Sequence, residues 1–127
     1  MDIFEKAITD IEKTIVKYFN ERNVSGIIGF FIKNFTGFSS TRHERLTNLA
    51  QLRKTFLYYL HEGDKVTYSI NNLKAHIYGE LALTTFYWKV TIRKGKKTKS
   101  VNGRGSHVFL MQDESWKIVH EHYSKTH

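Results

Sequence analysis

The sequence predicts a single α+β domain in which helices come first and a long antiparallel sheet follows. The chain has 127 residues, which is enough for one hydrophobic core and too few for two. Apolar residues recur at helical spacing in the first half, and the pattern changes to alternation from residue 65 onward. We therefore expect residues 1–127 to form one domain, with helices packed on one face of a curved sheet.

The first half contains three predicted helices and one short extended segment. Residues 2–22 place apolar side chains at steps of three and four, which is typical of an amphipathic helix. Ser25 is expected to cap a short second helix that extends to Phe31. Residues 35–40 read as a strand that leads into a polar loop, and residues 48–61 as a third helix with Asn48 at its start.

The second half predicts a meander of four strands. Alternating apolar residues and the turn residues between them place these strands at 65–78, 80–93, 98–111 and 116–124. The polar segment 112–115 is expected to join the last two strands as a four-residue turn. That loop length predicts three opposed pairs on one face of the sheet: Met111 with Trp116, Phe109 with Ile118, and His107 with His120.

The predicted inner face of the sheet is apolar and has imidazoles at one end. His122 follows His120 on the same face, and Glu121 is expected to point the other way. The predicted outer face is also too apolar for open water, with Thr85, Tyr87, Val108, Leu110, Val119 and Tyr123. We therefore expect a homodimer that packs the outer faces of two sheets together.

Composition narrows the function classes. With no cysteine, the chain has no disulfide, no thiolate metal site and no cysteine nucleophile. No apolar run reaches the length of a membrane span, and the N-terminus resembles neither a signal nor a transit peptide, so we expect a cytoplasmic protein. Net charge is +8, and the turn from Lys94 to Lys99 is strongly basic. We expect this turn to be solvated and not to bind nucleic acid, because no exposed aromatic platform accompanies it.

The segment Trp116-Lys117-Ile118-Val119-His120-Glu121-His122-Tyr123-Ser124, after helices and a meander, resembles the SnoaL-like group of the nuclear transport factor two superfamily. The same segment looks like the end of the association domain of calcium/calmodulin-dependent protein kinase. The resemblance implies a cone-shaped, curved antiparallel sheet with the N-terminal helices on its concave face. It also implies an internal cavity and a dimer formed through the sheet.

The superfamily resemblance leaves the activity open, since its members include isomerases, cyclases, dehydratases and assembly modules. Tyr18 looks like the tyrosine of the first helix that donates a hydrogen bond to the substrate oxygen in ketosteroid isomerases. The sequence departs from those enzymes because residues 35–40 contain no carboxylate, and the inward positions of strand 98–111 contain no acid. Isomerase activity of that specific kind is therefore not expected.

Histidines are the candidate chemical groups. We expect His107 and His120 to act as acid and base with Tyr18, on a small hydrophobic or planar ligand. Two alternatives stay open: histidines that only hydrogen-bond inside a binding cavity, and a three-histidine metal site, which the strand spacing disfavours. No cofactor is expected. The ligand-binding candidates are Phe31, Phe38, Arg42, Phe56, Tyr59, Phe86, Trp88, Phe109, Trp116 and His122.

A second hypothesis assigns the protein to a different class. In it the cavity has no ligand, and the outer face of the sheet makes a regulatory or structural assembly.

Overall fold

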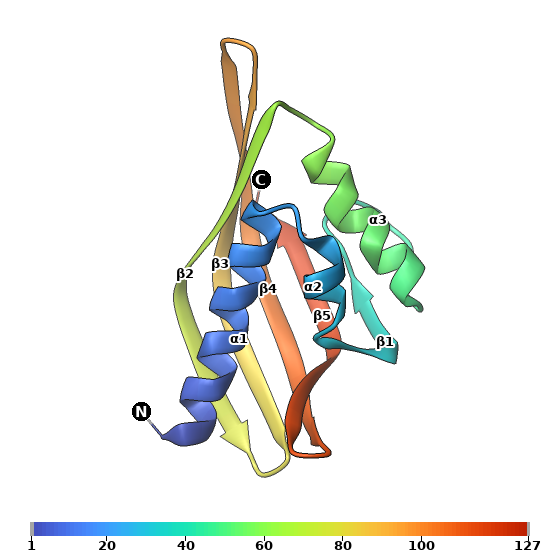
Figure 1. Ribbon diagram of the computed structural model, residues 1–127, viewed down its shortest axis with the longest axis vertical. Helices are drawn as coiled ribbons and strands as arrows, with labels where there is room; N and C mark the ends of the chain where they lie inside the picture. Colours follow the sequence, from blue (N-terminus) through green and yellow to red (C-terminus); the bar gives the residue numbers. More distant parts are fainter. Residues whose placement is uncertain (1, 127) are drawn as a thin grey trace.

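The computed structural model describes residues 2–126, which form three helices and five strands (Figure 1). The helices are α1 (Ile3–Asn20), α2 (Val24–Ile28) and α3 (Leu49–Leu60). The strands are β1 (Phe31–Phe38), β2 (Lys65–Tyr78), β3 (Leu81–Lys94), β4 (Lys97–Gln112) and β5 (Ser115–Lys125). They form one sheet in the order β1-β5-β4-β3-β2.

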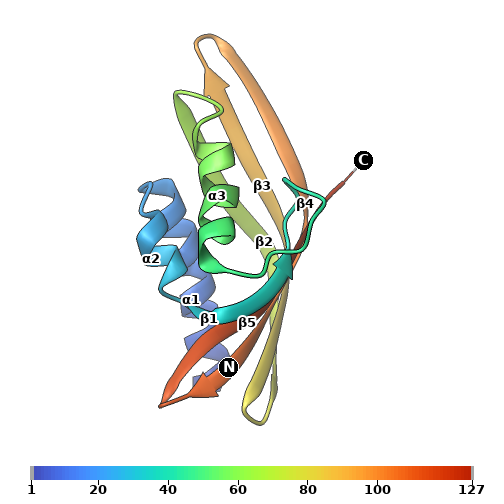
Figure 2. The ribbon, with the colours of Figure 1, turned by 90° about the vertical axis from the view of Figure 1, so that its right-hand side faces the viewer.

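The helices all lie on one face of the sheet, and no described helix covers the other face (Figure 2). The sheet is curved and its edge strands β1 and β2 do not pair, so it stays open. The core lies between the two layers and includes side chains from every strand and helix. The predicted α+β class, with helices first and a curved sheet after them, is confirmed.

The first helix forms where the apolar periodicity predicted it. Asp2 caps it, since its side chain accepts a hydrogen bond from the Glu5 backbone nitrogen at 2.8 Å. Its buried side chains lie at steps of three and four and include one acid: Ile8, Glu12, Ile15 and Phe19. A carboxylate in the apolar stripe of a helix needs a partner on the sheet, because an unpaired buried charge is very costly.

The side chain of Asn20 attaches the end of α1 to the sheet by making two hydrogen bonds with the backbone of Tyr68 on β2. Asn20 donates from Nδ2 to the Tyr68 carbonyl at 3.0 Å and accepts from the Tyr68 backbone nitrogen at 2.7 Å. These two bonds satisfy backbone groups of β2, which is an edge strand of the sheet. They therefore hold α1 against β2 in one position.

The segment between α1 and α3 differs from the sequence prediction. Asn23 caps α2 in place of Ser25, because its side chain accepts from the Gly26 nitrogen at 2.9 Å. The helix ends at Ile28, so Phe31 begins β1 instead of ending a helix. β1 then pairs with β5 in parallel, where a wholly antiparallel sheet was expected. A register shift between Phe31 and Thr36 interrupts the alternation, which hid the first part of the strand from the pattern.

The hairpins of β2 to β5 follow the prediction closely, and the predicted strand bounds differ by a residue or so. The β4–β5 turn is shorter than predicted, with two residues, Asp113 and Glu114, at φ values of 50° and 65°. Such a turn suits the twist of a hairpin. The register next to it is the expected one, with Met111 opposite Trp116, because loops of two and four residues both pair positions of the same parity.

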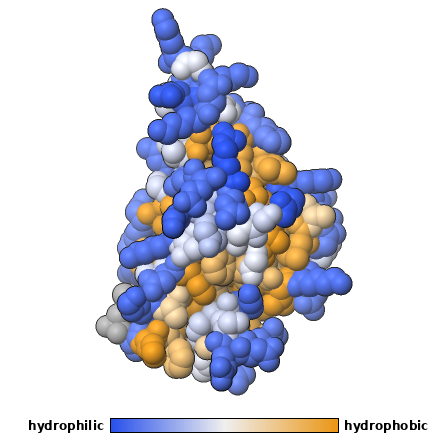
Figure 3. All heavy atoms as spheres, viewed as in Figure 1, coloured by the Kyte–Doolittle hydropathy of each residue, from blue (hydrophilic) through white to orange (hydrophobic). Residues whose placement is uncertain are grey.

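The basic hairpin of β3 and β4 extends beyond the helices. Residues 93–100 are all exposed, and Figure 3 shows this tip as a hydrophilic projection of the molecule. The expectation that the turn is solvated is therefore confirmed, and the absence of nucleic-acid binding stays a prediction. Over the described residues, no helix is both long and apolar enough to cross a membrane.

Candidate functional site

A buried network of three ionisable side chains connects α1 with the middle of the sheet. Nδ1 of His107, on β4, lies 2.7 Å from Oε2 of Glu12. Nε2 of the same ring lies 3.2 Å from Oε1 of Glu121, on β5. None of the three side chains is more than 3% exposed. The hydroxyl of Thr84 donates to Oε2 of Glu12 at 2.6 Å, which completes the Glu12–His107–Glu121 network.

His107 is a cation in this network. Burial lowers its pKa, but the charge and hydrogen bonds of Glu12 and Glu121 raise it more strongly, and the result is a pKa of about 10. The geometry agrees with this state, since each ring nitrogen faces a carboxylate oxygen and the imidazolium has an N–H on both. At neutral pH His107 therefore donates to both acids and fixes the orientation of each.

A β-bulge in β5 brings Glu121 into the interior. Phe109 is opposite Ile118, but Val108 is opposite His120, so β5 has one residue more than β4 at this point. Side chains beyond the bulge change faces, because successive residues of a strand alternate. Glu121 and Tyr123 therefore face the helices. The predicted pairing of His107 with His120 is wrong, and so is the expectation that Glu121 points away from the cavity.

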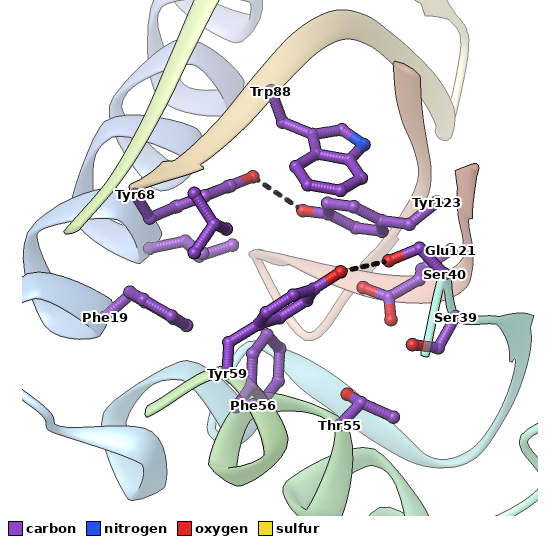
Figure 4. Close-up of a pocket in the computed structure, with 12 residues that line it drawn as sticks. Phe19, Ser39, Ser40, Thr55, Phe56, Tyr59, Tyr68, Trp88, Glu121 and Tyr123 are labelled. Carbon is purple, nitrogen blue, oxygen red and sulfur yellow. Dashed lines mark hydrogen bonds between the residues drawn. The ribbon is translucent and has the colours of Figure 1, made fainter. Parts of the chain in front are cut away.

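The carboxylate of Glu121 borders a hollow between the sheet, α1 and α3, which we call the inner pocket (Figure 4). Its volume is about 40 Å³. It is lined by Ile15, Phe19, Ser39, Ser40, Thr55, Phe56, Tyr59, Tyr68, Trp88, Val90, Glu121 and Tyr123. Oε1 of Glu121 accepts from His107, and Oε2 has no hydrogen-bond partner among residues 2–126. One carboxylate oxygen thus remains free to contact whatever occupies the pocket.

Three tyrosine hydroxyls give the apolar walls a few polar points. Tyr59 shares a hydrogen bond with Ser40 at 3.0 Å, and Tyr68 shares one with Tyr123 at 2.8 Å, as Figure 4 shows. Burial raises the pKa of all three tyrosines above the ordinary value. Their hydroxyls are therefore neutral at physiological pH and serve as donors and acceptors without adding charge.

A family model described as a SnoaL-like domain matches residues 8–126, almost the whole chain. The chain belongs to the SnoaL-like family. This is the group whose resemblance the segment from Trp116 to Ser124 indicated. Among proteins of curated function, none matches this SnoaL-like domain.

Solved structures share its fold at low sequence identity. A nuclear transport factor 2-like protein of unknown function from Pseudomonas putida KT2440 is 18% identical, with a TM-score of 0.82 over 94% of this chain and 84% of that chain. The association domain of CaMKII from C. elegans is 17% identical, with a TM-score of 0.77 over 97% and 99% of the two chains. A protein from Streptomyces avermitilis, provisionally named a dehydratase of the same superfamily, is 9% identical, with a TM-score of 0.82 over 97% and 96%. At these identities the similarity shows the fold alone.

The residues predicted for the site of this SnoaL-like domain separate into three groups. Three line the inner pocket: Phe56, Tyr59 and Trp88. Three pack around the buried ring of His107 without lining the pocket: Phe31, Phe86 and Phe109. Six lie elsewhere: Tyr18, Phe38, Arg42, Trp116, His120 and His122. Of these predicted residues, the structure thus brings Phe56, Tyr59 and Trp88 together in the inner pocket.

The expected partners of His107 lie outside the pocket for two different reasons. Tyr18 is next to the buried stripe of α1 and contacts α2 near Gly26, and its ring stacks on Phe30, which follows α2, with 6.2 Å between centroids. His120 and His122 lie after the bulge and face away from the helices. His122 is exposed and packs against Phe38, with 5.6 Å between ring centroids. Within residues 2–126, none of these three side chains lines the inner pocket or hydrogen-bonds to His107.

Arg42 and Trp116 are also separate from the pocket. Nε of Arg42 lies 3.8 Å from a Glu44 carboxylate oxygen in the same loop. Trp116 packs edge-on against Phe4 of α1 at the other end of the sheet, with 6.0 Å between centroids. The first residue belongs to a surface loop, and the second contributes to the core.

Four important residues were missed by the sequence interpretation: Glu12, Glu121, Tyr68 and Tyr123. A signal existed for Glu12, since it occupies a buried position of the helical stripe between Ile8 and Ile15. The inward positions of Glu121 and Tyr123 on β5 depend on the bulge, and no residue in the segment marks its place. Tyr68 was predicted on a strand, but its pairing with Tyr123 follows from the same bulge.

The network does not have the form of a metal site. Both nitrogens of His107 already face carboxylates on opposite edges of the ring. Over residues 2–126, no group of three His, Asp or Glu side chains has an arrangement that would hold a metal ion. The chemistry available is therefore hydrogen bonding and proton transfer at Glu121, with His107 as its positioning residue.

Proposed function

We propose that this SnoaL-like protein binds a small molecule in the inner pocket, and that the carboxylate of Glu121 is the group that contacts it. The observation that carries the proposal is that only one of the two oxygens of Glu121 is hydrogen-bonded to His107. Oε1 accepts from the imidazolium of His107 at 3.2 Å, no hydrogen bond within residues 2–126 reaches Oε2, and Glu121 lines the pocket. A carboxylate oxygen that accepts no hydrogen bond from the protein gains one when a donor enters the pocket.

The size of the pocket limits the ligand. A volume of about 40 Å³ accommodates about three water molecules. Pockets for drug-sized ligands have about 300 Å³ or more. Of the small hydrophobic or planar ligands expected from the sequence, this volume favours those with only a few heavy atoms.

The site also supports proton transfer as its chemistry. A carboxylate in a pocket with mostly apolar walls accepts a proton from a bound substrate and returns it to another atom, which is the step shared by isomerases and dehydratases. His107 stabilises the charge of Glu121 before and after the transfer, and Glu12 holds His107 from its other side. Glu121 replaces the histidine pair as the proposed acid and base.

Two tryptophans provide a direct test of binding. The chain has two, Trp88 in the wall of the pocket and Trp116 outside it, so the indole N–H signals of a ¹⁵N spectrum separate the pocket from the rest of the molecule. We expect a cocktail of compounds of about two to six heavy atoms to move the Trp88 signal and not the Trp116 signal. Glu121→Gln should abolish the shift, and Glu114→Gln, in the exposed β4–β5 turn, is the matched control. A Trp88 signal that no compound moves would refute the proposal.

A second candidate function is assembly through the outer face of the sheet. On this face Leu81 and Tyr87 are 45% and 49% exposed, and cross-strand pairs place Leu83 next to Val108. Exposed apolar side chains on an uncovered sheet favour a second copy of the chain as a cover. The similarity to the association domain of a kinase agrees with this candidate.

Sedimentation measures this assembly without a ligand. We expect a homodimer that Leu81→Lys converts to a monomer. Tyr58→Lys, at a 52% exposed position on the helix side, is the matched control and should leave the dimer intact. A wild-type monomer at about 100 μM would refute assembly through this face.

A further inference from the structure

We propose that the inner pocket is selective for a small organic cation, an alkylammonium ion of about two to four heavy atoms. The inference rests on the proposed function and adds the charge and chemical class of the ligand. Two independent features carry it: the formal charge of the buried network and the aromatic character of the walls.

The network has an uncompensated formal charge. Glu12 and Glu121 are two acids and His107 is one base, so the formal charges of the three groups sum to −1. No lysine or arginine lines the pocket, and none in residues 2–126 forms an ion pair with either acid. An excess charge in a buried site is costly unless a counter-charge is present. Glu121 lines the inner pocket, so its carboxylate brings that charge to the pocket.

The walls have the surface that a cation prefers to a neutral molecule. Six of the twelve lining residues are aromatic: Phe19, Phe56, Tyr59, Tyr68, Trp88 and Tyr123. Trp88 is central among them, with ring centroids 6.3 Å from Tyr59 and 5.9 Å from Tyr123. The faces of such rings attract an ammonium group, most strongly where water is excluded. A carboxylate combined with these rings is the arrangement that recognises alkylammonium ions.

Other ligand classes fit the same pocket less well. An anion meets the negative charge of Glu121 and no basic side chain. A neutral apolar molecule fills the volume but leaves the carboxylate oxygen without a donor, which makes burial unfavourable. A hydrated inorganic cation does not use the aromatic and aliphatic walls, which have hydroxyl groups only from serine, threonine and tyrosine.

The experiment compares four probes of similar size on the same protein. Ethylammonium, ethanol, acetate and potassium, each as a simple salt or solute, are titrated while the two tryptophan indole signals are recorded. We expect ethylammonium to move the Trp88 signal alone, with an affinity at least tenfold above that of ethanol, and acetate to have no effect. Glu121→Gln should lower the ethylammonium affinity at least tenfold, and Glu114→Gln should not change it.

A second variant keeps the test decisive if Glu121→Gln does not fold. Tyr59→Leu retains the carboxylate and removes one aromatic face, so it should weaken ethylammonium at least threefold and leave ethanol unchanged. Equal binding of ethanol and ethylammonium, or displacement of ethylammonium by equimolar potassium, would overturn the cation inference while the proposed small-molecule pocket stands. A Trp88 signal that none of the four probes and no compound of the cocktail moves would overturn both.

Discussion

Replacing His107 by glutamine removes the imidazole that lies between the carboxylates of Glu12 and Glu121. Because its pKa is about 10 instead of the ordinary 6.5, protonated His107 favours the folded state. A raised pKa gives stability that is complete below pH 6.5 and is lost as the pH rises to about 10. At about 1.4 kcal/mol for each pH unit, the whole contribution is on the order of 5 kcal/mol.

At pH 7 most of that contribution is present. His107→Gln should therefore lower the free energy of unfolding by about 4 kcal/mol, which agrees with the cost of about 3 to 5 kcal/mol for removing one partner from a buried ion pair. A domain of this size has a total of about 5 to 15 kcal/mol, so the variant is expected to fold but to be marginal. Adding Glu12→Gln to it should restore part of the loss, since one buried negative charge is removed as well.

Urea denaturation at pH 6, 7, 8, 9 and 10 measures both effects. The wild-type protein should lose stability steadily across this range, and His107→Gln should not show this dependence. His76→Gln, at an exposed position on β2, is the matched control and should follow the wild-type curve. A wild-type free energy that stays level from pH 7 to pH 10 would show that His107 is neutral, and the account of the network would be wrong.

Two further predictions concern the attachment of elements to the sheet. Asn20→Ala removes both bonds to the Tyr68 backbone and should cost about 1 to 3 kcal/mol in urea denaturation; a loss below 0.5 kcal/mol would contradict the role given to Asn20. Gly103→Ala would place a Cβ against the Ser124 carbonyl, so β4 and β5 must separate. We expect a clear fall in melting temperature and the loss of amide protection in β5. Gly79→Ala, where no atom lies within 4 Å of the added carbon, is a contrast whose cost comes only from its φ of 66°.

Local periodicity was sufficient for the fold class and for most of the elements. The stripe of α1, the Asn48 cap of α3 and the alternation of β2 to β5 all depend on residues near each other in the chain, so the sequence pattern predicts them directly. The class follows because helices before a meander have few ways to bury their apolar faces. The parallel strand β1 was predicted only in part, because its partner is more than 80 residues away.

The site was harder to predict, because one extra residue in β5 changes which side chains face inward. The sequence places His107, Phe56, Tyr59 and Trp88 on the inner side without help from the bulge. The bulge shifts the inward alternation of β5 from Ile118 to Glu121, and no residue of the segment marks where the shift occurs. The histidine pair was therefore expected where the structure has a carboxylate.

By itself, the amino-acid sequence determined the order of helices and strands, the amphipathic faces and the SnoaL-like family. Those properties depend on neighbouring residues and on total composition. The tertiary structure alone decided that Glu12 and Glu121 meet His107, and that the pocket measures about 40 Å³. The reason is physical: contacts across 95 residues and the volume left between packed layers depend on register and on packing, to which every element contributes.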